Sequence, residues 1–579
     1  MRETDLPMGT LRSDAWFARD DEVGLEHRAS LRAAGAPIVP GGGRPVIALI
    51  SSISELNPCN LPLRPLVEAA REGVIAAGGV PVEIPVMSLG EDLIKPTAML
   101  YRNLLAMEVE ENLRAQPIDG VVLFGNCDKT IPAELMAAAS ADLPAIQVAG
   151  GYRSPGQFRG TEIGAGTDLW SAWNDRRAGR LDDAGWHDLE VALSCSRGAC
   201  NVMGTAMSMA ILAEALGLML PGGATLPAGD PRLHHHAYRS GRRIVRLVHE
   251  QIVPSRILTE PAFQNALLVL AAVGGSTNAT VHLAAIAGRR AIRLDLDDLD
   301  RAARRTPVIA DIAPIGQQHI AAFDAAGGLP AVQAVLSGLL TPDLLTVAAT
   351  DDLPGPAGPA KGAIRPLTDP VTDRPAFTVL HGNLAPEGAV LKTAAADPAL
   401  FRHTGPAIVF DSYTDMLDRI DDPDLGATRD SVLVLRGCGP RGGDGFPEWG
   451  MIPIPRHLAA AGVTDMLRIS DARMSGTSFG TCVLHVAPDA ASGGPLGLVR
   501  TGDLITIDVD RRILRAHLDD EEIDRRQARL RPPPSRHRRG WPLLYDEHVM
   551  QAPAGADFDF LVPRDSAAQT WEEPVIGRS

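Results

Sequence analysis

The feature that most constrains the fold is a regular alternation of short apolar segments and helical segments between residues 45 and 150. The apolar segments are RPVIALIS, VPVEIPVMS, DGVVLFG and PAIQVAGG, and the stretches between them have helical periodicity, as in LRPLVEAAREGVIAAGG. Apolar strands separated by helices form a mostly parallel sheet that helices cover on both faces. We therefore predict an α/β domain with this sheet at its centre.

A chain of 579 residues is too long for a single hydrophobic core. Its composition changes in the segment 351–375, DDLPGPAGPAKGAIRPLTDPVTDRP, which is rich in proline and glycine and is typical of a domain boundary. Short strand-like segments such as PAIVFDS, SVLVLRG and TCVLHVA follow it, and they predict a smaller β-barrel-like domain. The predicted organisation is an N-terminal arm (1–44), an α/β domain (45–365) and a β-rich C-terminal domain (366–579).

The charge and the apolar runs exclude several classes of function. The net charge of −16 argues against nucleic-acid binding, and we interpret the basic segment 525–539 as a solvated arm or a subunit contact. The opening residues, MRETDLPMGTLRSDAWFARDDE, are too polar for a signal peptide. The longest apolar run, 266–275, is shorter than the ~20 residues that span a bilayer. We expect a cytoplasmic protein without a membrane partner, whose six cysteines are core thiols or ligands rather than disulfides.

Chemically distinctive side chains follow the first three predicted strands. Cys59 comes after the first strand, Glu91 after the second, and the run Cys127, Asp128 and Lys129 after the third. The carboxyl ends of parallel strands share one edge of a sheet, where open α/β sheets bind their ligands. The topology therefore predicts that these side chains meet at one site, although dozens of residues separate them in sequence.

A third cysteine, Cys200, directly precedes a predicted helix at 201–218, where free backbone N–H groups favour a thiolate or an anion. Thiolates suit zinc or iron–sulfur clusters and carboxylates suit Mg²⁺ or Mn²⁺, so this mixture indicates two neighbouring metal centres. The alternative is that each cysteine is an ordinary buried thiol. The spacings of 68 (127 − 59) and 73 (200 − 127) residues match no compact metal motif.

The segments around these cysteines, NPCN, GNCDKT and CNVMGTA, resemble the dehydratase family that includes dihydroxy-acid, phosphogluconate and sugar-acid dehydratases. The resemblance continues through GGSTNATVHLAAIAGR, GNLAPEGAVLK, SDARMSGTSFGT and HVMQAPAGADFDFL, and it covers residues from about 45 to 565. The segments MSLGE, PTAMLYRN, SGTSFGT and GADFDFL are most similar to the sugar-acid branch, the arabinonate and xylonate dehydratases. The dihydroxy-acid branch has two glycines after its third cysteine, where this chain has Asn201 and Val202.

The resemblance implies two metal cofactors and assigns their ligands residue by residue. The cysteines that match the ligands of a 2Fe–2S cluster are Cys59, Cys127 and Cys200. The residues that match the oxygen ligands of a neighbouring Mg²⁺ are Glu91, Asp128, Lys129 and Glu448. A protonated lysine cannot bind a cation; in this family the matching lysine is carbamylated, which makes it an anionic oxygen ligand. The alternative for Lys129 is an ordinary ion pair with Asp128 or Glu91.

The resemblance also implies a reaction, the dehydration of a sugar acid (an aldonate such as L-arabinonate or D-xylonate) to a 2-keto-3-deoxy acid. Ser475 matches the proposed catalytic base, and Thr477 matches a hydroxyl that supports it. A serine hydroxyl is a very weak acid, so its alkoxide would need stabilisation by a metal. Without the resemblance we would interpret Ser475 as a turn or helix-cap serine. Three cysteine ligands leave one iron position open to act as a Lewis acid on the leaving hydroxyl. The family further implies a homodimer or homotetramer.

Two other functions stay open at this point. One is the same reaction on a branched-chain dihydroxy acid, and the other is electron transfer by an iron–sulfur protein, which would not need the predicted Mg²⁺ ligands. Among the remaining residues, we interpret His234–His236 as a polar loop. We interpret Cys195, Cys438 and Cys482 as thiols without a ligand role, although Cys438 lies close to the Glu448 loop in sequence. The segment GGSTN before a helix indicates helix capping or a cradle for the substrate carboxylate.

Overall fold

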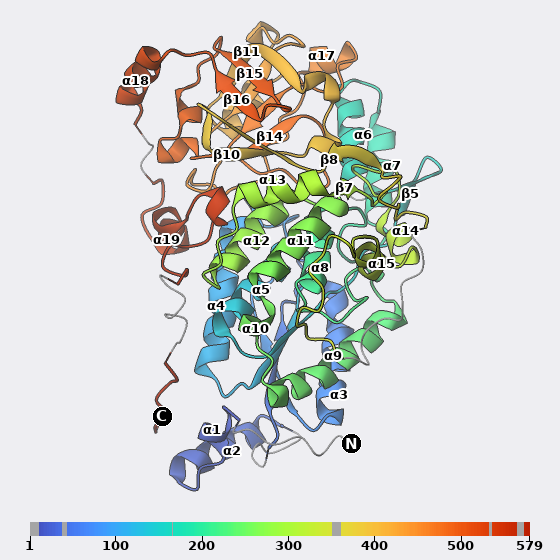
Figure 1. Ribbon diagram of the computed structural model, residues 1–579, viewed down its shortest axis with the longest axis vertical. Coiled ribbons are helices and arrows are strands. Elements are labelled where there is room, and N and C mark those ends of the chain that lie inside the picture. Colours follow the sequence, from blue (N-terminus) through green and yellow to red (C-terminus); the bar gives the residue numbers. More distant parts are fainter. Residues whose placement is uncertain are drawn as a thin grey trace.

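The computed structural model describes residues 11–36, 43–164, 166–349, 361–531, 535–563 and 572–578. An α/β part occupies the lower half of the molecule and a β-barrel the upper half (Figure 1). Parts of the predicted arm, of the basic segment 525–539 and of the boundary segment 351–375 lie outside the described residues, and the domain boundaries stay predictions. Within the described ranges, no helix has both the length and the apolar character needed to cross a membrane.

The predicted parallel sheet is confirmed. Its strands lie in the order β2-β1-β3-β4, and they are β1 (Val46–Ser51), β2 (Val80–Pro85), β3 (Gly120–Phe124) and β4 (Ala145–Val148). In β1, Ile47 pairs with Pro81 of β2 and with Gly120 of β3, both in parallel register. Every residue of β1 and β3 is buried, as expected for apolar strands covered on both faces. The strand order reverses between β1 and β3, and a ligand crevice forms at such a reversal in open α/β sheets.

Helices cover both faces of the sheet. Figure 1 shows α3 (Arg64–Ala76) and α9 (Pro231–Glu250) on one side, and α4 (Arg102–Ala115) and α5 (Thr130–Ala141) on the other. The backbones of α3 and α9 approach closely at two glycines. A Cβ on Gly73 would lie 2.1 Å from the carbonyl oxygen of Tyr238, and one on Gly241 would lie 2.1 Å from that of Ala70. Any larger residue at either position would separate the two helices.

The interpretation of His234–His236 as a polar loop is wrong, because these residues lie in α9. The helix begins with two standard signals: the side chain of Asp230 accepts a hydrogen bond from a backbone N–H of the first turn, and Pro231 follows. The buried residues of α9 recur at helical spacing from Leu233 to Val248, so the local sequence does favour a helix here. His236 is buried and its Nε2 lies 3.0 Å from a backbone carbonyl oxygen.

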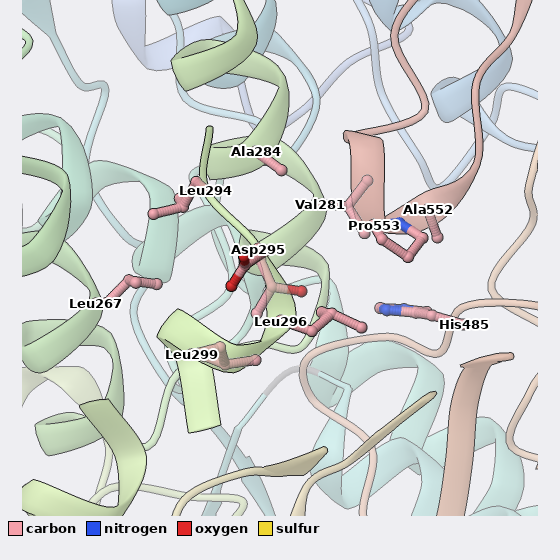
Figure 2. Close-up of a pocket in the computed structure, with 11 residues that line it drawn as sticks. Leu267, Val281, Ala284, Leu294, Asp295, Leu296, Leu299, His485, Ala552 and Pro553 are labelled. Carbon is pink, nitrogen blue, oxygen red and sulfur yellow. The ribbon is translucent and has the colours of Figure 1, made fainter. Parts of the chain in front are cut away.

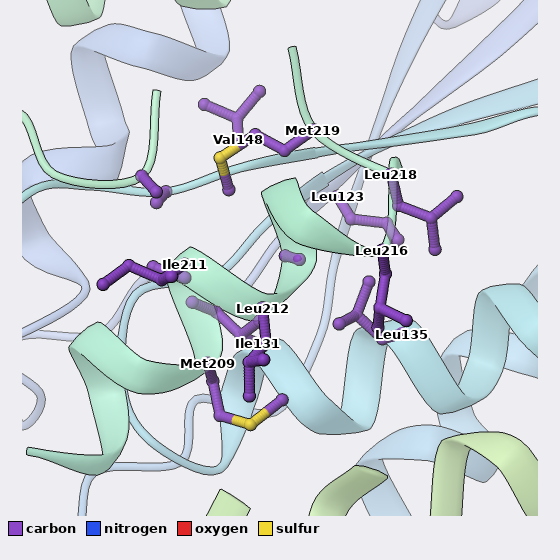
Figure 3. Packing of buried hydrophobic residues seen from close by; sticks show 14 of the residues in the cluster. Leu123, Ile131, Leu135, Val148, Met209, Ile211, Leu212, Leu216, Leu218 and Met219 are labelled. Carbon is purple, nitrogen blue, oxygen red and sulfur yellow. The ribbon is translucent and has the colours of Figure 1, made fainter. Parts of the chain in front are cut away.

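Two helices inside the α/β part are apolar on all sides, which is typical of helices enclosed by other elements. These are α5 and α8 (Thr205–Ala215), and they pack on each other and on β3 and β4 (Figure 3). Ile131 and Leu135 of α5 meet Met209 and Leu212 of α8 in this core. Because α5 begins directly after Lys129 and α8 begins just after Cys200, this packing fixes the position of both segments.

The C-terminal half contains the predicted β-barrel-like domain, and this prediction is confirmed. The strands close in the order β10-β14-β13-β12-β11-β15-β16-β9. They are β9 (Thr378–Gly382), β10 (Ala385–Leu391), β11 (Arg402–Phe410), β12 (Val432–Leu435), β13 (Arg468–Ser470), β14 (Cys482–Ala487), β15 (Leu504–Asp508) and β16 (Ile513–Ala516). Closure leaves no free sheet edge within the barrel, and apolar residues such as Leu380, Val434 and Ile505 form its core.

A small subdomain between β4 and α8 connects the two halves. It consists of β5 (Gly156–Phe158), β6 (Thr161–Ile163), α6 (Thr167–Arg177) and α7 (Asp183–Leu193), with its own core around Ile163 and Leu189. Figure 1 shows α6 and α7, drawn in teal, beside the barrel. Arg177 at the end of α6 pairs with Asp421 at 2.6 Å and donates to the carbonyl oxygen of Ile454 at 2.9 Å. We call this group of two strands and two helices the bridging subdomain.

The remaining elements complete the two halves. They are α1 (Asp14–Phe17), α2 (Glu22–Ala33), α10 (Pro254–Ile257), α11 (Glu260–Ala272), α12 (Asn278–Gly288), α13 (Leu296–Arg305), β7 (Pro307–Val308), α14 (Ile320–Ala325), α15 (Gly328–Val335), β8 (Thr372–Pro375), α16 (Tyr413–Arg419), α17 (Arg456–Ala460), α18 (Asp520–Arg529) and α19 (Gly540–His548). Short 3₁₀ turns lie between several of them.

Candidate active site

The three predicted cluster cysteines lie at the carboxyl edge of the sheet and line one cavity of about 640 Å³. Cys59 follows β1, Cys127 lies between β3 and α5, and Cys200 precedes α8. Contact with the thiol of Cys59 and burial raise the pKa of Cys127 well above its usual value, and burial raises the pKa of Cys200 to about 11. Both thiols are therefore protonated at neutral pH unless a cation compensates the thiolate charge.

One asparagine connects the two loops that carry Cys59 and Cys127. The Oδ1 atom of Asn60 accepts hydrogen bonds from the backbone N–H groups of Asn126 (3.2 Å) and Cys127 (2.9 Å). The side-chain amide of Asn126 donates in turn to the carbonyl oxygen of Cys59 at 2.7 Å. These bonds hold the loops after β1 and β3 together independently of the thiols.

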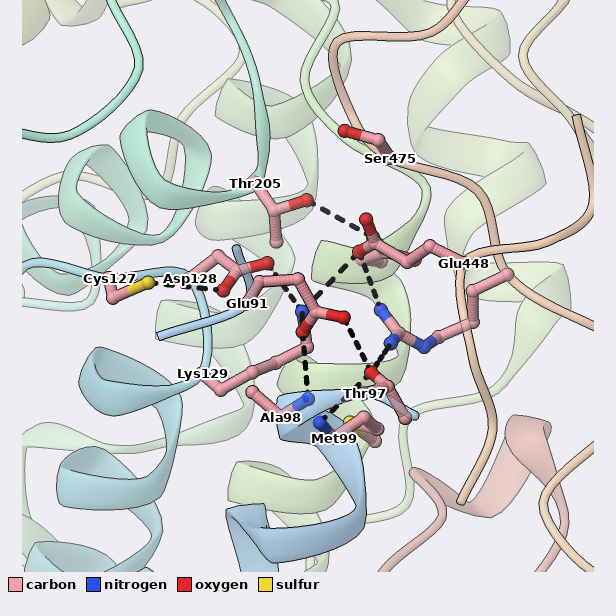
Figure 4. A network of polar contacts seen from close by, with 12 residues as sticks. Glu91, Thr97, Ala98, Met99, Cys127, Asp128, Lys129, Thr205, Glu448 and Ser475 are labelled. Carbon is pink, nitrogen blue, oxygen red and sulfur yellow. Dashed lines mark hydrogen bonds and ion pairs between the residues drawn. The ribbon is translucent and has the colours of Figure 1, made fainter. Parts of the chain in front are cut away.

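Lys129 lies beside the cysteines at the centre of three carboxylates (Figure 4). Its side chain is fully buried, and its Nζ lies 3.2 Å from Oε2 of Glu91 and 3.4 Å from Oε1 of Glu448. Asp128 is the third ion-pair partner of Lys129 and lies closest to its amine. Glu448 comes from the barrel half and the other carboxylates come from the sheet edge, so the two halves meet at this amine. All four predicted Mg²⁺ ligands are brought together.

The carboxylates hold Lys129 in its ammonium form in this arrangement. Burial by itself would lower the pKa of Lys129, but the charges of Asp128 and Glu91 raise it above its ordinary value. In the described parts of the chain, no three His, Cys, Asp or Glu side chains are arranged to hold a metal ion directly. This geometry is the ion pair of Lys129 with Asp128 or Glu91 that the sequence analysis left open as an alternative. Glu448 is added as a third carboxylate.

Three residues that the sequence analysis did not single out hold these carboxylates in place. Arg473, fully buried, donates to Glu448 Oε1 at 2.9 Å and to Thr97 Oγ1 at 3.1 Å. The hydroxyl of Thr97 in turn donates a hydrogen bond to Oε1 of Glu91 at 2.6 Å. The Nδ2 of Asn278 donates to Glu448 Oε1 at 2.7 Å. Arg473 and Asn278 lie in the segments SDARMSGTSFGT and GGSTN. The resemblance of these segments to the dehydratase family was the signal that could have identified both residues.

The GGSTN segment at the start of α12 has a capping interaction as well. Ser276 Oγ accepts a hydrogen bond from the backbone N–H of Asn278 at 3.1 Å and contacts Thr205 Oγ1 at 2.8 Å. The helix-capping interpretation is therefore confirmed, and the carboxylate that this segment contacts is the protein's own Glu448.

Ser475 and Thr477 lie in the loop between β13 and β14 and line the same cavity as the three cysteines. Their hydroxyl oxygens are 2.9 Å apart. The loop reaches the sheet edge because Gly476 fits against α8 and α12: a Cβ on Gly476 would lie 2.7 Å from Ser276 Oγ and from the backbone nitrogen of Thr205. Figure 4 shows Ser475 next to Glu448 and Thr205.

Four aromatic side chains from both halves of the molecule form part of the remaining cavity wall. They are Trp170 and Trp173 of the bridging subdomain, together with Tyr413 and Trp449 of the barrel half. A second cavity, between α12, α13 and His485, is far smaller, at about 20 Å³, and is lined mainly by apolar side chains (Figure 2). It has room for a water molecule but not for a sugar acid.

The other cysteines lie outside the large cavity. Cys195 is exposed and donates to the carbonyl oxygen of Ser154 at 3.3 Å. Cys438 and Cys482 are buried, and the backbone N–H of Cys438 donates to Asp471 at 3.0 Å. That all three are thiols without a ligand role stays a prediction.

Comparison with known proteins identifies the family. The family model described as dihydroxy-acid/6-phosphogluconate dehydratase N-terminal matches residues 44–351, and the corresponding C-terminal model matches residues 362–556. The chain belongs to this dehydratase family. It is therefore an enzyme, a hydro-lyase, and not an electron-transfer protein, and the resemblance found in the sequence is confirmed.

Individual relatives extend over nearly the whole chain. A 6-deoxy-6-sulfo-D-gluconate dehydratase of Pseudomonas putida is 46% identical over 100% of both chains. An L-arabinonate dehydratase of Rhizobium leguminosarum is 45% identical, covering 95% of this chain and 96% of its own. A dihydroxy-acid dehydratase of Mycobacterium bovis is 38% identical, covering 93% of this chain and 96% of its own. The sugar-acid dehydratases of this comparison are thus more similar to the chain than the dihydroxy-acid dehydratase is.

Proposed function

We propose that this dehydratase removes water from an aldonate with hydroxyl groups on C2 and C3 and forms a 2-keto-3-deoxy sugar acid, with L-arabinonate and D-xylonate as candidate substrates. The observation that carries the proposal is the single cavity into which both the Ser475–Thr477 pair and the carboxylates around Lys129 open. The higher identity to sugar-acid dehydratases supports an aldonate over a branched-chain dihydroxy acid. So does the wall of Trp, Tyr and Asn side chains, because ring faces suit the C–H groups of a polyol and amides suit its hydroxyls.

The donor chemistry of the site fits the two cofactors that the family implies. We propose that Cys59, Cys127 and Cys200 hold a 2Fe–2S cluster, because soft thiolates suit iron. We propose that the oxygen donors of a neighbouring Mg²⁺ site are Glu91, Asp128, Glu448 and a carbamylated Lys129. When bound, these cofactors supply Lewis acidity toward the oxygens of the substrate.

The chain's own residues would then move the proton and exclude water. In the proposed reaction, the alkoxide of Ser475 takes the proton from C2, and the C2–C3 double bond forms as the C3–O bond breaks. Ser475 Oγ then gives this proton to the departing hydroxide, which leaves as water, and the alkoxide is restored. The resulting enol ketonises to the 2-keto-3-deoxy acid. Thr477 orients Ser475 through their 2.9 Å contact. The aromatic wall keeps bulk water from the reacting carbons, which strengthens every charge interaction in the cavity.

The substrate assignment is tested with anaerobically purified enzyme supplied with Mg²⁺. Formation of 2-keto-3-deoxy acid is measured across a panel of C5 and C6 aldonates, with 2,3-dihydroxyisovalerate as the comparison substrate. We expect at least one aldonate to have a higher kcat/KM than the branched-chain acid. Preference for dihydroxyisovalerate over every aldonate would replace the proposal with the branched-chain reaction.

We predict that Lys129 becomes carbamylated only when CO₂ and Mg²⁺ are both present. Without a cation, a carbamate would add a fourth negative charge beside three carboxylates, whereas the ammonium form is stabilised there. Carbon NMR of enzyme treated with ¹³C-bicarbonate should show a carbamate signal that appears with Mg²⁺ and disappears in Lys129→Arg.

The matched control for this experiment is a second buried amine. Burial lowers the pKa of Lys392 to about 7, so this amine is more easily neutral and able to react with CO₂. The signal should persist in Lys392→Met. A signal that is lost in Lys392→Met and kept in Lys129→Arg would show that Lys392, and not Lys129, is carbamylated. Absence of any carbamate signal in the Mg²⁺-loaded enzyme would contradict the predicted carbamylation altogether.

A further inference from the structure

We propose that Trp170 is a positioning residue that acts through Thr477 to direct a hydrogen bond onto Ser475 Oγ, and so prepares this oxygen to accept a proton. The inference rests on the proposed role of Ser475 as the base, and it adds what makes that serine reactive. Trp170 lies in α6 of the bridging subdomain, whereas Ser475 and Thr477 lie in the barrel half.

Three hydrogen bonds carry the inference. Nε1 of Trp170 donates to Thr477 Oγ1 at 3.2 Å. Thr477 Oγ1 lies 2.9 Å from Ser475 Oγ, and the backbone N–H of Thr477 donates to the same serine oxygen at 3.4 Å. Two donor positions of one residue therefore converge on the atom that is to accept the substrate's proton.

The chemistry of the groups sets the direction of this relay. An indole N–H can only donate, so Thr477 Oγ1 is the acceptor of the first bond. A hydroxyl has a single proton, and a hydroxyl oxygen that accepts one hydrogen bond becomes a better donor in the next. The bond from Trp170 thus favours Thr477 as the donor to Ser475. Hydrogen-bond donors aimed at an oxyanion stabilise its charge, so this arrangement favours the alkoxide form of Ser475, which is the form that can take the substrate's proton.

Close packing keeps Thr477 in the orientation that the relay needs. Gly166, at a φ of +88°, lies so close that a Cβ there would be 2.3 Å from Thr477 Oγ1. On the other side, a Cβ on Gly204 would be 2.9 Å from Thr477 Cγ2. Two glycines therefore leave room for this side chain and restrict its rotation, and Thr477 is 5% exposed.

The helix that carries Trp170 is attached to the barrel half at both ends. At its start, Thr167 Oγ1 donates to the carbonyl oxygen of Thr477 at 2.9 Å. At its end, Arg177 pairs with Asp421 at 2.6 Å. The indole is thus fixed relative to the Ser475 loop, although it belongs to a different part of the chain.

The test removes the N–H group without removing the ring. Trp170 is replaced by 3-benzothienylalanine, which has sulfur in place of the indole N–H, and separately by Trp170→Phe. The control is Trp186→Phe, which removes an indole of α7 that packs on Trp173 at 5.7 Å between ring centroids and is not among the residues of the cavity wall. For each enzyme, kcat and KM are measured with the best aldonate of the panel, and release of the C2 proton is followed by deuterium exchange.

A second readout does not depend on turnover. A fluorophosphonate probe forms a bond from phosphorus to Ser475 Oγ and releases fluoride, so its rate of reaction measures the activation of this oxygen. Labelling of the anaerobically prepared holoenzyme is followed by intact mass, and the site is assigned with Ser475→Ala.

We expect the benzothienyl enzyme to lose about tenfold in kcat and in labelling rate, which is less than the ~10²–10³-fold cost of removing a direct oxyanion donor. Its KM should stay within about twofold, because the ring still forms the cavity wall. Trp186→Phe should match the wild type in both readouts. Trp170→Phe should lose at least as much kcat as the benzothienyl enzyme.

Wild-type kcat and labelling in the benzothienyl enzyme would overturn the proposal, and so would an effect on KM alone, which would make Trp170 a wall residue. Absence of Ser475 labelling in the wild type would also overturn it. If the wild type dehydrates none of the acids in the panel, the proposed substrate class fails, but the labelling rates still decide the role of Trp170.

Discussion

Replacing Ser475 by alanine is expected to abolish turnover of the proposed sugar-acid substrate while both proposed metal sites keep their contents. Loss of a general base costs ~10²–10⁴-fold in rate, and the loss is larger if the alkoxide also interacts with a cation. The metal sites should survive because their predicted ligands, the cysteines and the carboxylates around Lys129, lie on other elements of the fold. The decisive measurement pairs turnover with exchange of the substrate's C2 proton for solvent deuterium, and metal content is determined in the same sample.

Thr477→Ala is the graded comparison for this experiment. Thr477 orients Ser475 but does not itself take the proton, so its removal should reduce turnover less than the loss of Ser475 does. Near-normal turnover and exchange in Ser475→Ala would remove the serine from the mechanism. A loss of metal together with activity in Ser475→Ala would show that the serine is needed for the site to assemble, and it would not support a role as base.

The contact between the two halves makes this prediction physically reasonable. Ser475 can act on a substrate held at the sheet edge only if the barrel half places its loop there. Glu448, from the same half, lies 3.4 Å from the amine of Lys129, and Ser475 shares a cavity with Cys59 and Cys127. The sequence placed these residues in different domains, and the fold brings them together.

Much of the α/β part could be predicted from the sequence because its signals are local. Apolar strands alternate with amphipathic helices, and the polar residues Cys59, Glu91 and Asp128 each follow a strand. Parallel strands have their carboxyl ends on one edge, so topology alone predicted that these residues meet. A β-barrel-like domain was also predicted, from short strands separated by turn residues, and the structure shows that its strands close into a barrel.

The residues that the sequence missed are defined by contacts between distant segments. Arg473 connects Glu448 with Thr97, and Trp170 reaches Thr477 from another subdomain. Arg473 lies in a segment that resembles the dehydratase family, but no local pattern shows which distant residues such an arginine or tryptophan contacts. Helix α9 was missed although its signals are local: Asp230 and Pro231 begin it, and its buried side chains recur at helical spacing.

Replacing Cys127 by serine is expected to remove the iron–sulfur cluster and, with it, all turnover. Serine preserves the size of the side chain. The hydrogen bonds that Asn60 Oδ1 accepts and that the Asn126 amide donates, which hold the Cys59 and Cys127 loops together, involve no thiol. The fold should therefore survive. A hydroxyl is a hard ligand, far more weakly acidic than a thiol, and the cluster would lose one of three soft thiolate ligands. Iron and acid-labile sulfide are measured in anaerobically purified protein, together with the visible absorption spectrum.

The matched control is Cys195→Ser, which makes the same change five residues before Cys200 on an exposed thiol that lies outside the cavity wall. The thiol of Cys195 contacts the backbone carbonyl of Ser154 at 3.3 Å, so this variant should keep the iron and sulfide content of the wild type. Unchanged iron and sulfide content in Cys127→Ser would contradict the assignment of Cys127 as a cluster ligand. Loss of the cluster from Cys195→Ser alone would instead make Cys195 the ligand and Cys127 an ordinary buried thiol. Thermal unfolding of both variants, compared with the wild-type protein stripped of iron, separates loss of the cluster from loss of the fold.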